Sequence, residues 1–581
     1  ASNNTAVGKS ALAANTTGTE NVGLGRFALY ASTTGNYNTA VGTNALFTNT
    51  TASSNTAVGS NALLVNTTGD TNTAVGKDSM KTNTTGTNNG AFGSRTLQLN
   101  TTGTNNVAVG DLALGANTTA DNNTAVGTSA LLANTTGTNN VAVGKDALDS
   151  NTTGSNNTAL GVDTLQANTT ASDSTALGHG ALAVSTGASN TAVGKYALVA
   201  NTTASNNVAV GKSALEANTT GTNNTALGAE ALDANTTANN NTAIGKVSLG
   251  ANTTGASNTA VGSGALFANT TASNNTAVGV NSLVANTTGA SNVAVGALAL
   301  DANTTASNNT AVGYSALTAN TTGAGNVAVG YNVLDANTTA DNNVGIGFEA
   351  LTGCTTGPAN VCIGYRTGAL LTTGNDNTAV GVVAMGNGVI TGSTNTAVGY
   401  AALYSLTSGT DNLALGRDAG RTGSPGGQVT TGDKKIFIGD ETMTAAHIQI
   451  DWTVASDARD KTDFTALDLG LDFVKDLQPV TYKWDKRSQY GDKTADDYDL
   501  TSQTPDGTHK EDWLDIGFKA QEVEALEIAA GYNKDNKTNL VSSHTDDGKQ
   551  MGLQYSKFVP ILVKAIQEQQ ALIESLTARI E

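Results

Sequence analysis

The sequence predicts a mainly β protein: a long parallel β-solenoid, or β-roll, followed by a small α+β domain that ends in a coiled-coil helix. Three observations carry this prediction. Residues 1–416 repeat with a 17-residue step, charged residues make up only 13% of the chain, and the composition changes abruptly near the C-terminus.

The repeat combines two short phrases that alternate along the chain. Asn-Thr-Ala-Val-Gly recurs every 17 residues, for example from Asn38 and from Asn55. Between these phrases, Ala-Leu precedes Asn-Thr-Thr-Gly, as in residues 62–69. About two dozen units follow one another, with slips near Ser185, near Asn387 and at the end. Self-similarity at a fixed short period is typical of a solenoid.

Alternation along the strand predicts how each coil folds. Thr and Val of Thr-Ala-Val share one face, Ala and the preceding Asn share the other, and the Gly that follows allows a tight corner. Stacked coils are expected to align Val and Leu into apolar columns, and Asn and Thr into hydrogen-bonded ladders. Because each coil offers only a thin core, we expect the chain to form a homotrimer.

The phrase Asn-x-Ala-Val-Gly-x-x-Ala-Leu resembles the head repeats of trimeric autotransporter adhesins, whose period is slightly shorter. The resemblance implies left-handed parallel β-rolls, three side by side.

Three features of the repeat allow a second interpretation. Asn-Thr-Thr is an N-glycosylation sequon, although a turn and ladder motif is favoured. The Thr arrays suggest ice binding, but they lie at loop-like positions before Gly. Cys354 and Cys362 replace the Asn and the Ala of other units, so buried small residues are favoured over a redox pair or an interchain bridge.

Charge and hydropathy exclude several function classes. A net charge of −18 leaves no basic patch for nucleic acid, and no apolar run is long enough for membrane insertion. No Asp-rich calcium turn accompanies the coils, and no metal or cofactor is expected. The chain starts at Ala1 in mid-repeat, without a Met or a signal peptide, so we expect a fragment that lacks its natural N-terminal end.

The repeat decays after residue 416. We expect a shaft over residues 1–416, a transition over residues 417–455, and a separate domain over residues 456–581. The expected strands cover Lys435–Gly439, Ile448–Trp452 and Val480–Trp484, and the expected helices cover Leu467–Leu477, Ala520–Leu526 and about 558–581.

The last expected helix carries seam residues alternately four and three apart, which is a heptad pattern. Gln569 places a polar group in the seam, where it can fix register at a cost in stability. We favour an intermolecular, trimeric coiled coil over a helix that packs on its own domain. The seam consists of Leu562, Ile566, Gln569, Ile573, Leu576 and Ile580.

The densest polar cluster runs from Ser456 to Lys461. A Ser hydroxyl becomes a nucleophile when a neutral Lys accepts its proton, and burial favours the neutral amine. Taken alone, this spacing favours a solvated polar loop.

Further motifs favour a nucleophilic Ser456 over a solvated polar loop. They are Ser-Asp-x-Arg-x-Lys from residue 456, Leu-Gln-Pro-Val-Thr-Tyr from 477, Ile-Gly-Phe-Lys-Ala-Gln-Glu-Val from 516, Leu-Gln-Tyr from 553 and Pro-Ile-Leu-Val-Lys-Ala-Ile from 560. In this order they resemble the self-cleaving intramolecular chaperone domain of phage tail spikes and tail fibres, of the endosialidase type. The resemblance spans residues 456–581.

The resemblance implies a trimeric domain that aligns three chains and then removes itself. It implies Ser456 as the nucleophile, Lys461 as its base, and scission of the Ser456–Asp457 bond. Asp457 and Arg459 would shape the site. An acidic insertion at 490–512 departs from the family pattern. The resemblance also implies a functional histidine, for which His509 and His544 are candidates, but neither lies in a matched motif.

The sequence therefore predicts a structural protein with one self-cleavage per chain and no turnover enzyme. We expect a trimeric bacteriophage tail fibre or appendage, assembled in the host cytoplasm, that attaches the virion to a host glycan or surface protein. Its missing N-terminal end would bind other virion proteins. A bacterial cell-surface adhesin rod is the alternative. A polysaccharide-degrading spike is disfavoured because it would need clustered carboxylates in a cleft.

Overall fold

The computed structural model describes residues 1–424, 426–443, 446–447, 449, 454–491, 498–535, 538, 540–545 and 547–581. The chain divides into two units, Ala1–Gly325 and Asn326–Glu581, and each is described by itself.

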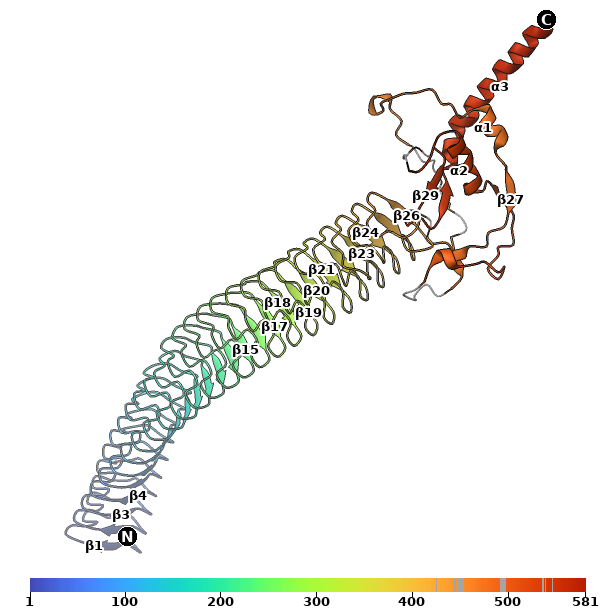
Figure 1. The fold of residues 1–581 in the computed structure, drawn as a ribbon. Helices are drawn as coiled ribbons and strands as arrows, with labels where there is room; N and C mark the ends of the chain where they lie inside the picture. The colour runs from blue at the N-terminus through green and yellow to red at the C-terminus, as the bar shows by residue number, and fades with distance from the viewer. Residues whose placement is uncertain are drawn as a thin grey trace. The chain divides into compact units, whose positions relative to one another are not determined.

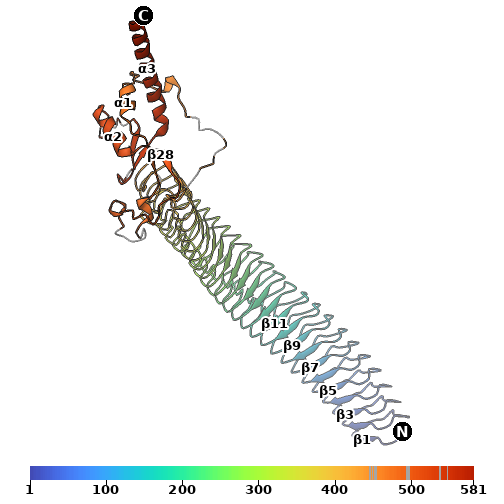
Figure 2. The ribbon, with the colours of Figure 1, turned by 90° about the vertical axis from the view of Figure 1, so that its right-hand side faces the viewer.

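The first unit, every residue of which is described, contains nineteen three-residue strands, one per coil, in a parallel sheet (Figures 1 and 2). The strands are β1 (Thr5–Val7), β2 (Val22–Leu24), β3 (Thr39–Val41), β4 (Thr56–Val58), β5 (Thr73–Val75), β6 (Gly90–Phe92), β7 (Val107–Val109), β8 (Thr124–Val126), β9 (Val141–Val143), β10 (Thr158–Leu160), β11 (Thr175–Leu177), β12 (Thr191–Val193), β13 (Val208–Val210), β14 (Thr225–Leu227), β15 (Thr242–Ile244), β16 (Thr259–Val261), β17 (Thr276–Val278), β18 (Val293–Val295) and β19 (Thr310–Val312).

The second unit continues with coils of the same kind. Their strands are β20 (Val327–Val329), β21 (Val344–Ile346), β22 (Val361–Ile363), β23 (Thr378–Val380), β24 (Thr396–Val398), β25 (Leu413–Leu415) and β26 (Ile436–Ile438). Successive strands of this unit pair in parallel. The solenoid of 17-residue coils predicted from the sequence is therefore confirmed.

The register of the strands follows the repeat. Thr56 of β4 pairs with Thr73 of β5, a step of 17 residues. The step is sixteen between β11 and β12 and eighteen between β23 and β24, which matches the slips predicted near Ser185 and Asn387. The last step is longer, since Leu413 of β25 pairs with Ile436 of β26.

The core of each coil differs in one respect from the expectation. Ala57 in the middle of β4 and Leu63 in the following turn are fully buried, but Val58 points outward and is partly exposed. The predicted Leu column therefore exists, whereas the prediction of a Val column inside a single chain is wrong. Thr and Val do share one face, as expected, but that face points outward, and Ala, Asn and Leu side chains fill the interior.

Two asparagine ladders join the coils. Asn72 donates its backbone N–H to Oδ1 of Asn55 (2.9 Å), and the Asn55 amide donates to the carbonyl oxygen of Gly69 (3.0 Å). In the second ladder, the amide of Asn66 donates to Oδ1 of Asn49 (2.9 Å) and to Gly69. These Asn side chains are fully buried, so the polar groups are satisfied internally. Burial of Asn66 within an Asn-Thr-Thr phrase supports a ladder motif rather than a glycan acceptor.

The turns hold backbone conformations that a coil cannot keep alone. In the coil of β4, Asn61, Leu63 and Thr71 have φ near +59°, +48° and +59°. This left-handed region costs about 1–2 kcal/mol for a residue with a side chain. Each of the three donates its backbone N–H to another coil, at 3.0–3.1 Å. Stacking therefore fixes the turns.

The two cysteines are free and buried. Cys354 takes the place of a ladder Asn and directs its Sγ to the carbonyl oxygen of Gly357 at 3.3 Å. Cys362 lies in the middle of β22, where other strands have Ala. Burial raises the pKa of Cys354 to about 11, and it also raises the pKa of Cys362. Both therefore act as small core residues, as the sequence favoured.

The C-terminal part of the second unit is a small α+β fold. Its strands β27 (Val480–Tyr482) and β28 (Asp515–Gly517) pair antiparallel, as do β29 (Ser542–His544) and β30 (Met551–Leu553). Its helices are α1 (Leu471–Asp476), α2 (Ala520–Ala529) and α3 (Phe558–Ile580), with 3₁₀ turns at Ala458–Asp460, Arg487–Gln489, Leu500–Ser502 and Tyr555–Lys557. A shared core joins α1, α2 and the start of α3, through Leu469, Phe473, Leu477, Val523, Val541, Phe558 and Ile561.

The predicted elements of this part agree in type and differ in length. The helix expected over 467–477 begins later, at Leu471, after Gly470, whose missing side chain makes it a poor helix former. The other two helices and the strand at Val480 lie where they were expected. The strand expected over Ile448–Trp452 falls mainly outside the described residues. In the described part of the chain, no helix has the length and apolar character needed to cross a membrane.

Candidate functional site

The polar cluster at 456–461 folds as a single 3₁₀ turn. Asp457 caps the turn by accepting the backbone N–H of Arg459, and the backbone N–H of Lys461 closes it on the carbonyl oxygen of Ala458. This short turn returns the chain so that the side chains of Ser456 and Lys461 meet: Nζ of Lys461 donates to Oγ of Ser456 at 2.6 Å. The two residues that the sequence singled out as a dyad are therefore in direct contact.

The other two predicted site residues form an ion pair beside the dyad. The guanidinium of Arg459 donates from Nε and Nη2 to the Asp457 carboxylate, at 2.5–3.1 Å. These hydrogen bonds from Arg459, together with its backbone N–H, hold the pKa of Asp457 below its usual value. The ion pair fixes the backbone that immediately follows the Ser456 carbonyl group.

In a single chain this site is open to solvent. Ser456, Asp457, Arg459 and Lys461 are all exposed. A lysine acts as a base only when it is neutral, and exposure to water favours its charged form. The arrangement brings a hydroxyl and an amine into contact, but in the single chain water surrounds both groups.

The two histidine candidates lie elsewhere in the domain. His544, at the end of β29, contacts Oε1 of Glu524 on α2 through Nε2 at 2.6 Å, and both side chains are largely buried. His509 lies in the acidic insertion, with its ring edge-on to Tyr490 at 4.8 Å, and it is exposed. His544 therefore belongs to the packed part of the domain, and His509 to its surface.

Sequence reasoning missed a buried carboxylate on α2. Glu527 is fully buried and accepts the backbone N–H groups of Leu540 (2.7 Å), Val541 (2.5 Å) and Ser542 (3.0 Å), as well as the Ser542 hydroxyl. It ties α2 to the chain that enters β29. The one sequence feature that could have indicated its burial is its position four residues after Val523, on the buried face of the helix.

The seam residues of α3 are exposed, although the helix is anchored to its domain. Phe558, Ile561 and Ala565 are buried against the domain. The seam lies on another face, where Ile566 and Ile580 are 64% and 85% exposed. The remaining seam residues are also exposed: Leu562, Gln569, Ile573 and Leu576.

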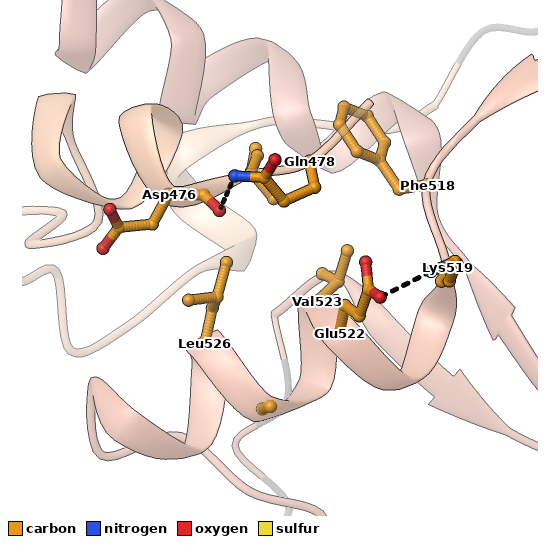
Figure 3. Close-up of a pocket in the computed structure, with 9 residues that line it drawn as sticks. Asp476, Gln478, Phe518, Lys519, Glu522, Val523 and Leu526 are labelled. Carbon is orange, nitrogen blue, oxygen red and sulfur yellow. Dashed lines mark hydrogen bonds and ion pairs between the residues drawn. The ribbon is translucent and has the colours of Figure 1, made fainter. Parts of the chain in front are cut away.

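Two cavities of the domain are walled mainly by apolar side chains. One cavity of about 190 Å³ lies between the end of α1 and α2, beside Phe518, Val523 and Leu526 (Figure 3). Two polar side chains of its rim are paired with each other, since Lys519 Nζ contacts Glu522 Oε1 at 2.7 Å. A second cavity, of about 400 Å³, lies beside α3 and includes Leu562 of the seam. Such walls are suited to packing rather than to catalysis.

One known protein family matches the part of the chain that contains the Ser456–Lys461 contact. Residues 456–532 match the family described as chaperone of endosialidase. The match begins at Ser456 and covers the dyad, α1, β27, β28 and α2. No match to a curated protein was found. The chain thus joins a β-solenoid to a region similar to the chaperone of endosialidase, as the sequence motifs predicted.

Proposed function

We propose that the chain is a subunit of a homotrimeric fibre and that residues 456–581 act as its intramolecular chaperone. The match of residues 456–532 to the chaperone of endosialidase carries this proposal. The fibre would be a tail fibre or appendage of a bacteriophage virion, assembled in the host cell and used for attachment to the host surface.

Two surfaces of the single chain support association between copies. The exposed seam of α3 would be buried in a trimeric coiled coil. Along the solenoid, the third residue of every described strand is Val, Leu, Ile or Phe and points outward. Within each unit these side chains form an apolar column, which marks an interaction face rather than a solvated one.

The repeat itself gives a reason for a chaperone. Neighbouring coils are nearly identical, so two chains displaced by one coil would make almost the same contacts. Parallel pairing is also non-local and therefore slow to form. A trimeric domain at one end would align the chains before the coils stack, and its removal would make unfolding kinetically difficult.

Self-cleavage would need more than one chain. Attack by Oγ of Ser456 on its own carbonyl carbon would close a strained β-lactone. We infer instead that Oγ attacks the Ser456 carbonyl carbon of a neighbouring chain in the trimer. Neutral Lys461 would accept the hydroxyl proton and pass it to the departing Asp457 amine, and water would then hydrolyse the ester. Packing of the chains would exclude the water that surrounds the dyad in a single chain.

Deletion of residues 457–581 tests the chaperone proposal. The truncated chain should aggregate or remain misfolded, and adding the domain as a separate chain should not restore it fully, because the domain must be attached to align the shafts. Soluble trimers of the truncated chain, with the same β-sheet circular dichroism as the mature fibre, would contradict the proposal.

A further inference from the structure

Three successive coils of the second unit carry an unusually apolar outer face. In β20, β21 and β22 both outward residues of the strand are aliphatic, as with Val344 and Ile346 of β21. No other three successive strands among β1–β26, all of them described, share this feature, because Thr or Gly interrupts the first position. Ile346 and Ile363 are more than one-third exposed.

A stack of aromatic rings extends this face. Tyr331, Phe348 and Tyr365 occupy the same position in these coils, two residues after each strand ends. Tyr331 and Phe348 lie 5.1 Å apart at 8°, and Phe348 and Tyr365 lie 5.4 Å apart at 10°. Each ring is more than two-fifths exposed. The outward strand residues of β20–β22 and these three rings form what we call the apolar patch.

The chemistry of the apolar patch favours a second copy of the chain over a sugar. The rings cover one another's faces, so a sugar ring would meet mainly their edges. The outward strand positions of the patch carry only aliphatic side chains, whereas sugar sites use several convergent polar groups. Among the residues that follow the strands, the charged side chains of Arg366 and Glu349 are already paired with each other (3.3 Å).

The spacing of the patch fits the same partner. A parallel copy presents identical side chains at the same step from coil to coil, which a partner without this repeat cannot do. The patch is continuous with the apolar column of the strands, and only the four coils that carry β23–β26 separate it from the C-terminal domain.

We propose that the apolar patch packs against the same patch of neighbouring copies and is the first part of the shaft to lock in register. This inference rests on the proposed trimeric fibre. Once the C-terminal domain had aligned three chains, these coils would bury more apolar area per step than the Thr-containing coils before them. The shaft would then close from the patch toward the N-terminus.

The test is the rate at which differently labelled full-length chains exchange between oligomers in dilute guanidinium. The triple variant Tyr331→Ser, Phe348→Ser and Tyr365→Ser should exchange at least about tenfold faster than the wild type. Ser already occupies this position in other coils, at Ser60, Ser94 and Ser263, so the coil should tolerate it.

A control removes a two-ring stack of similar geometry from another position of the coil. Tyr30 and Phe47 are stacked at 5.1 Å and 7°, just after the buried Leu of their coils. Their double Ser variant should exchange at the wild-type rate. If the triple variant does not fold, Val344→Thr provides the same test, because Thr is the usual first residue of the strands.

The outcomes separate the two proposals. A wild type that is monomeric would overturn the trimeric fibre itself. A trimeric wild type whose triple variant exchanges at an unchanged rate would overturn only the role of the patch. Loss of binding to host cells without faster exchange would also overturn it, since the patch would then contact a foreign partner.

Discussion

Nζ of Lys461 lies 2.6 Å from Oγ of Ser456, across the turn formed by residues 458–460. The contact is made by residues five apart in sequence and needs no other part of the chain. What the single chain lacks is the exclusion of water around it. The chemistry of this site is therefore expected to depend on assembly.

Removal of either member of the dyad should abolish cleavage. Ser456→Ala removes the hydroxyl, and Lys461→Met keeps the length of the side chain without its amine. Both variants should give only the intact chain on denaturing gels, whereas the wild type should also give a small C-terminal fragment. Thr462→Ala is the control, because its hydroxyl contacts Asp463 rather than the dyad. Cleavage that persists in Ser456→Ala would remove Ser456 from the mechanism.

Mixed oligomers distinguish cleavage within a chain from cleavage between chains. When tagged Ser456→Ala chains are co-expressed with wild type, attack by a neighbouring Ser456 should cut part of the tagged chains. Mass spectrometry of the tagged product should place the cut after residue 456. Tagged chains that stay intact in verified mixed trimers would show that each chain cuts only itself.

The asparagine ladder should be the costliest polar feature of the coil to remove. Asn100 donates to Oδ1 of Asn83 (2.8 Å) and to the carbonyl oxygen of Gly103 (3.0 Å), and it is fully buried. Asn100→Ala should lower the free energy of unfolding in guanidinium by about 1–3 kcal/mol, because it leaves the buried Oδ1 of Asn83 without its donor. The exposed Thr102→Ala, two residues away, should change it by less than about 0.5 kcal/mol.

Acid should loosen the attachment of α3 to α1. Glu568 of α3 accepts the backbone N–H of Leu471 at 2.7 Å, and this bond, with help from Lys564, lowers the pKa of Glu568 below its ordinary value of 4.5. A lowered folded-state pKa means that the ionised form stabilises the fold. This contribution is complete above pH about 4.5 and is lost as pH falls through the lowered value.

Thermal unfolding of Glu568→Gln should therefore depend less on pH than that of the wild type, between about pH 6 and about pH 3. Glu574→Gln, whose side chain contacts Gln570 on the exposed face of the same helix, is the control. An unchanged pH dependence in Glu568→Gln would show that the bond to Leu471 does not contribute.

Much of the solenoid could be predicted because the same residue types recur with the period of the coil. The slips in register near residues 185 and 387 and the replacement of a ladder Asn by Cys354 follow from alignment of the units alone. The outward direction of Val58 could not be derived, since alternation defines two faces without saying which one is enclosed. The left-handed backbone at Leu63 was also hidden, because only stacking maintains it.

The candidate site could be predicted only in part from the sequence. Local spacing singled out Ser456 and Lys461, but the family resemblance was needed to prefer them over a solvated loop. Glu527 escaped notice because its partners, the N–H groups of residues 540–542, come from a distant segment and carry no side-chain signature. A single sequence does not reveal contacts between chains directly. It indicates them only through apolar faces that have no partner within the chain, such as the seam of α3.

The mass and oligomeric state of the expressed protein, by native mass spectrometry with analytical ultracentrifugation, test the proposed fibre most directly. We expect a trimer whose chains end at Ser456, together with a C-terminal fragment that begins at Asp457. A monomer, or a stable oligomer of another order, would contradict the proposal that three aligned chains form the fibre.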